Sequence, residues 1–381
     1  MKPKHIGKNF TLTSASLAIL ALSASCSGPN AVTPNGTLER AQGKPAGAPG
    51  QETTIQQQVV LGRILRTLRP YESMPSGLHV ATRSFMDPRA VGKRLVFIST
   101  FGSSGGVVDI YLEADTHQKM VGQIAAPAPE GLATEADGKL YVANSTASNV
   151  GNVLVYAPPY SKPPKRTLDD MGYFPNGVAV SRRGVVAVAN FCDAPSCSGA
   201  GNVVFYRKNS TEPCATVADA TNFFVFLNDA FDNRGNLYVT ALDPNYNFVI
   251  GEVRGGCRAT TITPLTTTNM LHEAYAVQVD QWGRIVVINY TGGSGYDVLD
   301  VYEPPKNGSL GSPIKDIEVV DGITLPVDYV FSASNGAVYT AEQGGGGVLN
   351  SFDFHGGGTP ERSIVVGGAP QGVAAYPPLV P

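Results

Sequence analysis

A motif that recurs roughly every 40 to 50 residues constrains this chain more than any other feature. After residue 130 a short apolar segment is followed five times by a tight turn, a β-rich segment, a loop and another strand that ends near Tyr or Phe. The turns are Glu135-Ala-Asp-Gly138, Ser181-Arg-Arg-Gly184, Asp232-Asn-Arg-Gly235, Asp280-Gln-Trp-Gly283 and the one-residue-longer Ser332-Ala-Ser-Asn-Gly336. Self-similarity at this period predicts an array of β-blades.

The strands around these turns form six units. The strands after the turns are Leu140-Tyr-Val-Ala143, Val185-Val-Ala-Val188, Leu237-Tyr-Val-Thr240, Ile285-Val-Val-Ile288 and Val338-Tyr-Thr-Ala341. Leu95–Ile98 and Val107–Tyr111 mark an earlier unit, and the segment that precedes each turn recurs once more at the end, as Gly372–Tyr376. We expect this last strand to complete the first unit, because closing a ring removes unpaired strand edges. Pro75–Val80 is a competing first strand for that unit.

Composition supports an all-β fold and excludes one class of partner. The 43 Gly and 28 Pro punctuate alternating β-branched runs, so they indicate many turns. Helical periodicity is nearly absent, and 54–68 is the only segment that fits a helix. The net charge is −3 and basic residues are scattered, apart from stretches at 63–69 and 162–166 that we interpret as solvated surface. We therefore expect no nucleic acid partner.

The N-terminus has the pattern of an export signal. Lys2, Lys4 and Lys8 precede a short apolar core at Leu12–Leu22, which is too short to span a membrane. Ser23-Ala24-Ser25 then precede Cys26 and resemble a bacterial lipobox, so we predict lipidation of Cys26, with ordinary cleavage as the alternative. The predicted organisation is therefore a signal peptide at 1–26, a flexible tether at 27–57, an unassigned lead-in at 58–77 and a β-propeller at 78–381.

The other four cysteines indicate disulfides. An even number in an exported chain favours disulfide bonds, and four cysteines allow three pairings. Cys192 and Cys197 are close enough in sequence to clip one loop. Cys214 and Cys257 follow the third strands of successive units, where a bond would connect neighbouring blades. No Cys-x-x-Cys and no suitably spaced His supports a metal site instead.

The units resemble those of a known class of propeller. Pro175-Asn-Gly-Val-Ala-Val180 and Gly138-Lys-Leu-Tyr-Val-Ala-Asn144 are similar to the repeats of NHL-repeat and SMP-30/gluconolactonase-like proteins. The resemblance covers residues 78–377 and implies a six-bladed β-propeller of four-stranded blades. It says little about activity, because this architecture serves lactonases, other hydrolases, lyases and binding scaffolds.

In such propellers the first strand of each blade lines a central channel. Polar residues at the starts of these strands and at the ends of the second strands are then expected at one mouth. The first-strand set is Glu130, Asn176, Asn228, Asp328 and Gln371, with Tyr275 in the remaining blade. The second-strand set is Asn144, Asn190, Asn289 and Glu342. We predict ligand binding by this second set together with Gln371.

The resemblance also implies a metal. Gluconolactonase-like enzymes hold a divalent ion with a Glu, two Asn and an Asp, and Glu130, Asn176, Asn228 and Asp328 provide these residue types. Oxygen ligands of this kind suit Ca²⁺ or Mg²⁺. Leu227 stands where a polar residue is expected, and Asn and Asp also commonly cap strand ends. The four histidines after residue 78 are dispersed, and no Gly-x-Ser-x-Gly motif marks a nucleophile.

These observations lead to two competing hypotheses. In the preferred one the chain is an exported bacterial lipoprotein whose monomeric propeller binds a small polar ligand or a protein, and which meets the membrane only through its lipid anchor. In the alternative it is a metal-dependent hydrolase of the lactonase type, with Ca²⁺ as the expected ion.

Overall fold

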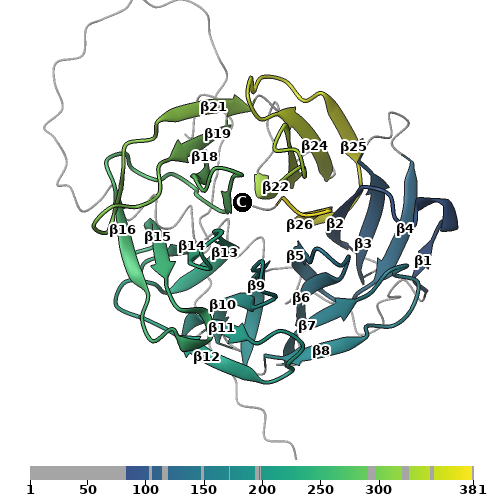
Figure 1. The fold of residues 1–381 in the computed structure, drawn as a ribbon, viewed down its shortest axis with the longest axis horizontal. Helices are drawn as coiled ribbons and strands as arrows, with labels where there is room; N and C mark the ends of the chain where they lie inside the picture. The colour runs from purple at the N-terminus through teal and green to yellow at the C-terminus, as the bar shows by residue number, and fades with distance from the viewer. Residues whose placement is uncertain are drawn as a thin grey trace, which may run out of the picture. The chain divides into compact units, whose positions relative to one another are not determined.

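The computed structural model describes residues 83–379, with gaps at 103–104, 114–118, 147–149, 171, 194–196, 198, 291–296, 320–325 and 344–346. These residues form six antiparallel sheets arranged as the blades of a propeller (Figure 1). Helical structure in the described part is limited to two 3-10 turns, η1 (Pro88–Ala90) and η2 (Gly256–Arg258). The all-β prediction is therefore confirmed. The predicted signal peptide, Cys26, the tether, the lead-in, the 54–68 helix and the Pro75–Val80 strand lie outside the described residues.

Each blade contains four core strands, which follow one another from the channel to the outer edge. Blade 1 has β26 (Ala369–Tyr376), β2 (Leu95–Gly102), β3 (Gly105–Leu112) and β4 (Met120–Ala125). Blade 2 has β5 (Pro129–Thr134), β6 (Leu140–Thr146), β7 (Val150–Tyr156) and β8 (Arg166–Asp169). Blade 3 has β9 (Tyr173–Val180), β10 (Val186–Asp193), β11 (Ala200–Tyr206) and β12 (Pro213–Val217).

The other three blades have the same order of strands. Blade 4 has β13 (Val225–Phe231), β14 (Leu237–Leu242), β15 (Phe248–Val253) and β16 (Thr263–Thr267). Blade 5 has β17 (Val277–Val279), β18 (Ile285–Tyr290), β19 (Asp297–Tyr302) and β21 (Lys315–Val319). Blade 6 has β22 (Pro326–Phe331), β23 (Ala337–Glu342), β24 (Val348–Asp353) and β25 (Arg362–Val365).

The C-terminal strand closes the ring, as the sequence predicts. β26 pairs antiparallel with β2, from Leu95 opposite Tyr376 to Phe101 opposite Ala369. Every innermost strand also contacts the innermost strands of its two neighbouring blades, and β26 contacts β5 and β22. The six innermost strands therefore surround a central channel (Figure 1). Strand direction gives this channel two ends, which we call the start side, where the innermost strands begin, and the turn side, where they end.

The repeated turns join the first and second strands on the turn side. In all five, the N–H of the fourth residue donates to the carbonyl oxygen of the first, at 2.8 to 3.1 Å. Gly138, Gly184, Gly235 and Gly283 have φ between 76° and 88°, in the left-handed region that only glycine adopts without strain. In the longer turn Asn335 takes this position with φ of 55°. The backbone conformation of the four shorter turns therefore requires glycine at the fourth position.

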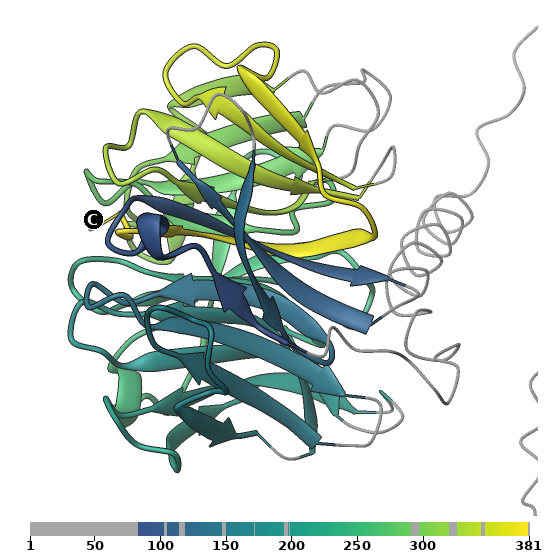
Figure 2. The same ribbon diagram turned by 90° about the vertical axis from the view of Figure 1, so that its right-hand side faces the viewer.

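Two additional strands extend the blades beyond the repeat. β1 (Phe85–Met86) pairs with β4 at the outer edge of blade 1 (Figure 2). β20 (Ser309–Gly311) leaves the loop between β19 and β21 and pairs in parallel with β16. It thereby connects blade 5 to the outer edge of blade 4.

The predicted disulfides are both present, as Cys192–Cys197 and Cys214–Cys257. The first clips a single loop of blade 3. The second connects β12 of blade 3 to η2 of blade 4, so it fixes two neighbouring blades to each other. Among the described residues, no helix is long and apolar enough to span a membrane.

Candidate functional site

A hydrogen-bonded pair connects the innermost strands of blades 4 and 6 across the channel. The Asn228 side-chain N–H donates to Asp328 Oδ1 at 3.0 Å, and Asn228 Oδ1 accepts the N–H of Val277 at 3.2 Å. Asp328 also accepts the N–H groups of Tyr329 at 2.8 Å and Val373 at 2.9 Å. Blades 4, 5, 6 and 1 are connected in this way. The innermost strands have no neighbouring strand on the side that faces the channel. The pair therefore accepts hydrogen bonds from backbone N–H groups that no strand pairing would satisfy.

Burial dominates the electrostatics of this pair. It raises the pKa of Asp328 to about 7, although the hydrogen bonds from Val373, Tyr329 and Asn228 lower the pKa. The N–H of Val277 holds the Asn228 oxygen, so the amide presents its N–H group to Asp328. The two side chains are therefore oriented as donor and acceptor, and not as two oxygen ligands of one cation. Within the described ranges, no group of three or more His, Cys, Asp or Glu side chains is placed to hold a metal ion.

Glu130 and Asn176 have other surroundings. The Asn176 side-chain N–H donates to the carbonyl oxygen of Leu227 and so connects blades 3 and 4. Glu130 is buried, which raises the pKa of its carboxyl well above the usual value. Hydrogen bonds described in the structure connect neither residue to Asn228 or Asp328. The assignment of these four residues to a metal stays a prediction.

The apolar residues at the start side form a cluster of their own. Leu227 and Tyr275 are buried in a hydrophobic cluster with Phe191, Val225 and Leu242. The Tyr275 ring also packs edge-on against Phe248, at 5.4 Å between ring centroids. Leu227 therefore contributes to packing between blades, which explains the apolar residue at a position where the resemblance implies a polar one.

The second-strand residues make local connections within their blades. Asn144 donates to Asn152 at 3.1 Å and accepts the N–H of Ala128 at 3.0 Å. The Asn289 amide makes equivalent contacts with the Asp300 carboxylate and the His272 N–H.

The other members of this set follow the same pattern. Asn190 donates to Asn202 at 2.7 Å, and Glu342 accepts a hydrogen bond from Thr340. Gln371, by contrast, accepts from Gln343 of the neighbouring blade at 3.2 Å. In the described structure these side chains therefore form hydrogen bonds that connect strands or neighbouring blades. Their role in ligand binding stays a prediction.

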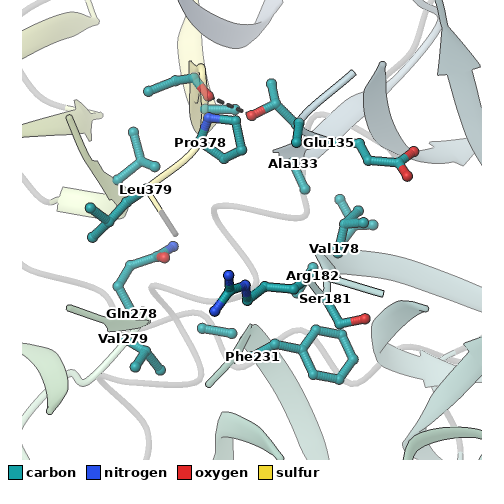
Figure 3. A pocket seen from close by; sticks show the side chains of 18 of the residues that line it. Ala133, Glu135, Val178, Ser181, Arg182, Phe231, Gln278, Val279, Pro378 and Leu379 are labelled. Atoms are coloured by element: carbon teal, nitrogen blue, oxygen red, sulfur yellow. Dashed lines mark hydrogen bonds between the residues drawn. The ribbon is translucent and has the colours of Figure 1, made fainter. Parts of the chain in front are cut away.

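A cavity of about 280 Å³ opens at the turn-side end of the channel. Its walls are the last residues of the innermost strands and the turns that follow them, together with Pro378 and Leu379 from the C-terminus (Figure 3). The polar mouth that the sequence predicts lies at the start side, and it stays a prediction. This cavity lies at the opposite end of the channel.

Asp229 lines this cavity and has no hydrogen-bond partner for either carboxylate oxygen among the described residues. Its side chain is only 3% exposed. Burial raises the pKa of Asp229 well above the usual value, and the neighbouring charge of Asp328 adds to this. Most buried polar groups in proteins are hydrogen-bonded, so an unpaired carboxyl beside a cavity requires an explanation.

The space for this carboxyl comes from glycine in the neighbouring strand. A Cβ on Gly177 would lie 2.7 Å from Asp229 Oδ1. In the strand register Asp229 corresponds to apolar or aromatic residues of the other blades, namely Leu132, Val178, Val277, Tyr329 and Val373. We did not predict Asp229 from the repeat, although a charged residue at a position that is otherwise Leu, Val or Tyr is a visible departure from the repeat.

Two further polar side chains border the cavity. Arg182, from the turn after β9, extends its guanidinium over the opening, and Gln278 of β17 directs its amide towards it (Figure 3). Arg182 forms no ion pair or side-chain hydrogen bond within the part of the chain that the structure describes, whereas Glu135 accepts from Lys208 at 2.9 Å. The site therefore combines a buried carboxyl, a free guanidinium and an amide.

Comparison with solved structures supports the fold. A protein of unknown function from Bacteroides caccae superposes with a TM-score of 0.51 at 12% identity, over 74% of this chain and 99% of that protein. TolB from Acinetobacter baumannii superposes with a TM-score of 0.53 at 12% identity, over 75% of this chain and 67% of TolB. No protein-family model and no curated protein matches the sequence. At such identities the likeness shows a shared fold and nothing about activity.

Proposed function

We propose that this chain is a binding module that holds a small polar ligand with an acidic group at the turn-side end of its propeller channel. The observation that carries the proposal is Asp229, a buried carboxyl without a hydrogen-bond partner in the described structure, on the wall of a cavity. Leaving such a group unpaired costs about 1–3 kcal/mol. A ligand that hydrogen-bonds to Asp229 recovers this cost only when it is bound.

The chemistry of the site defines the ligand class. Burial raises the pKa of Asp229 and so favours its protonated form, which donates a hydrogen bond to a ligand hydroxyl or carbonyl oxygen. Arg182 pairs with a carboxylate or phosphate, and the Gln278 amide contributes both a donor and an acceptor. A volume of about 280 Å³ holds roughly nine water molecules at about 30 Å³ each. This size suits one sugar acid or one amino acid.

The two disulfides support a location outside the cytoplasm. Disulfide bonds persist in oxidising compartments and are rare in the cytosol. The signal-like segment that ends at Cys26 supports the same location. We therefore include export and a lipid anchor at Cys26 in the proposal, and mass spectrometry of the mature N-terminus tests both.

Ligand binding is tested by thermal shift with a panel of small acids. Glucuronate, galacturonate, citrate and glutamate are compared with neutral glucose, on wild type and on Arg182→Ala. Arg183→Ala is the matched control, because Arg183 is the next residue of the same turn and does not line this cavity. We expect an acid to stabilise the wild type and Arg183→Ala and to lose its effect on Arg182→Ala. Equal stabilisation of all three proteins contradicts the proposal.

A metal-dependent lactonase-type hydrolase is the competing hypothesis. It is favoured by Glu130 and Asp328, two buried carboxyls with raised pKa on innermost strands of the ring. The Asn228–Asp328 orientation argues against a shared ion. Metal analysis of purified wild type, Glu130→Gln and Asp328→Asn decides between the two. Metal bound by the wild type and lost from both variants, together with lactone hydrolysis, supports the enzyme.

A further inference from the structure

A second and larger cavity lies on the turn side, between blades 3 and 4. Its volume is about 690 Å³. Its walls are the two turns after β9 and β13 and the segments that follow β11 and β15. The Cys214–Cys257 disulfide spans the same pair of blades, and Cys257 is itself part of the wall. The covalent bond holds the two sides of the cavity at a fixed spacing.

Arginine dominates this cavity. Its walls include five arginines, namely Arg182, Arg183, Arg207, Arg234 and Arg258. All five side chains are exposed, and none forms an ion pair or a side-chain hydrogen bond with any residue that the structure describes. Unpaired guanidiniums gathered in one concavity repel one another and focus a positive potential. This arrangement favours a multivalent anion.

Nearby carboxylates do not neutralise the cluster. Asp232 is the only acidic residue among the described residues of the wall, and its Oδ1 accepts the backbone N–H groups of Arg234 and Asn236, both at 2.9 Å. Glu252, further along blade 4, is paired with Arg254 at 2.8 Å. The excess positive charge of the cavity is therefore available to a ligand, although the whole chain carries a net charge of −3.

The residue types in the wall also indicate which class of polyanion the cavity binds. Single-stranded nucleic acids bind by stacking bases on exposed aromatic rings. Phe231 is the one aromatic residue in the described part of the wall, and it is buried in the core between blades 3 and 4. Exposed large apolar side chains, which anchor most protein partners, are likewise missing from the described residues of this wall. A polyanion with closely spaced anionic groups and no bases therefore suits this wall better than a nucleic acid or a protein does.

We propose that this arginine cavity binds a segment of an acidic polysaccharide through the carboxylate or sulfate groups of successive sugars. The choice of a polysaccharide rests on the export included in the proposed function. The site adjoins the channel cavity and shares Arg182 with it, but its other four arginines do not line that cavity. Guanidinium forks pair with such groups in a bidentate manner. Binding is consequently electrostatic and weakens steeply with salt.

The test measures fluorescence anisotropy of labelled oligogalacturonate over a series of NaCl concentrations. The variant is Arg183→Ala/Arg207→Ala/Arg258→Ala, which leaves Arg182 of the channel cavity intact. The control is Lys162→Ala/Lys165→Ala/Lys306→Ala, which removes the same charge from exposed positions outside this wall. Neutral dextran and oligothymidylate are the comparison ligands, and Arg207→Gln replaces the triple variant if that variant does not fold.

We expect the arginine variant to bind oligogalacturonate about tenfold or more weakly and the lysine variant to bind as the wild type does. The slope of log affinity against log salt falls by about one for each arginine removed. Equal weakening in both triple variants overturns the site, because only net charge then matters. Absence of wild-type binding, or tighter binding of oligothymidylate, overturns the polysaccharide assignment. Acid-induced thermal shifts at the channel test the proposed function separately.

Discussion

Replacing Asp229 by alanine is expected to stabilise the protein. The carboxyl is 3% exposed and neither oxygen has a partner in the described structure. An unsatisfied buried polar group costs about 1–3 kcal/mol, and the adjoining cavity already leaves space beside it. Asp229→Ala should therefore increase the free energy of unfolding by about 1–3 kcal/mol at neutral pH. Such a gain is typical of residues retained for binding at the expense of stability.

The gain should depend on pH with a defined sign. Because burial raises the pKa of Asp229, the folded state keeps a proton that the unfolded state loses above about pH 4. Wild-type stability then falls as pH rises through this range, by up to about 1.4 kcal/mol per pH unit for this one proton. Asp229→Ala lacks this contribution. The stability difference between variant and wild type should increase from pH 5 towards neutral pH.

Urea unfolding followed by circular dichroism at several pH values measures both effects. Asp109→Ala is the matched control, because Asp109 is also buried with a raised pKa but accepts a hydrogen bond from Gln123 at 2.8 Å. Removal of Asp109 should destabilise the protein. If Asp229→Ala is less stable than the wild type at every pH, Asp229 has a structural role and our reasoning is refuted.

Three further predictions concern the closed ring. Asp328→Ala should lower the free energy of unfolding by about 3–5 kcal/mol in urea unfolding, because it leaves buried N–H groups unpaired. An unchanged unfolding midpoint would contradict a stabilising role of these hydrogen bonds. Gly372→Ala should cost about 1–3 kcal/mol in the same assay, since its Cβ would lie 2.5 Å from the Glu130 carbonyl oxygen, and wild-type stability would disprove the close approach. Cys214→Ser/Cys257→Ser should lower the free energy of unfolding by about 4 kcal/mol relative to the oxidised wild type, because the bond closes a loop with a sequence separation of 43 residues. An unchanged free energy of unfolding would mean that the bond does not constrain the unfolded chain.

The fold was predictable because its determinants are local and repeated. Turn glycines such as Gly138 and Gly235 require a positive φ, and period-2 strands follow each of them. Counting the units identified six blades, and the unpaired Gly372–Tyr376 segment identified closure by the C-terminus. The parallel pairing of β20 with β16 had no such signal, because it depends on two loops that are distant in sequence.

The candidate site was less predictable, because its properties arise between blades. The sequence indicated that Asn228 and Asp328 would meet, and they do, at 3.0 Å. The sequence did not indicate that the backbone N–H groups of Val277 and Val373 would donate hydrogen bonds to the side-chain oxygens of Asn228 and Asp328. Asp229 stands out only in the three-dimensional structure, where no described donor forms a hydrogen bond with its buried carboxyl.

In our proposal the ligand binds at the turn-side end of the channel. Isothermal titration of the small acid that gives the largest thermal shift, with wild type, Asp229→Ala and Arg183→Ala, tests it most directly. We expect Arg183→Ala to keep the wild-type affinity and Asp229→Ala, although more stable, to lose most of it. Binding of equal affinity to all three proteins would contradict the claim.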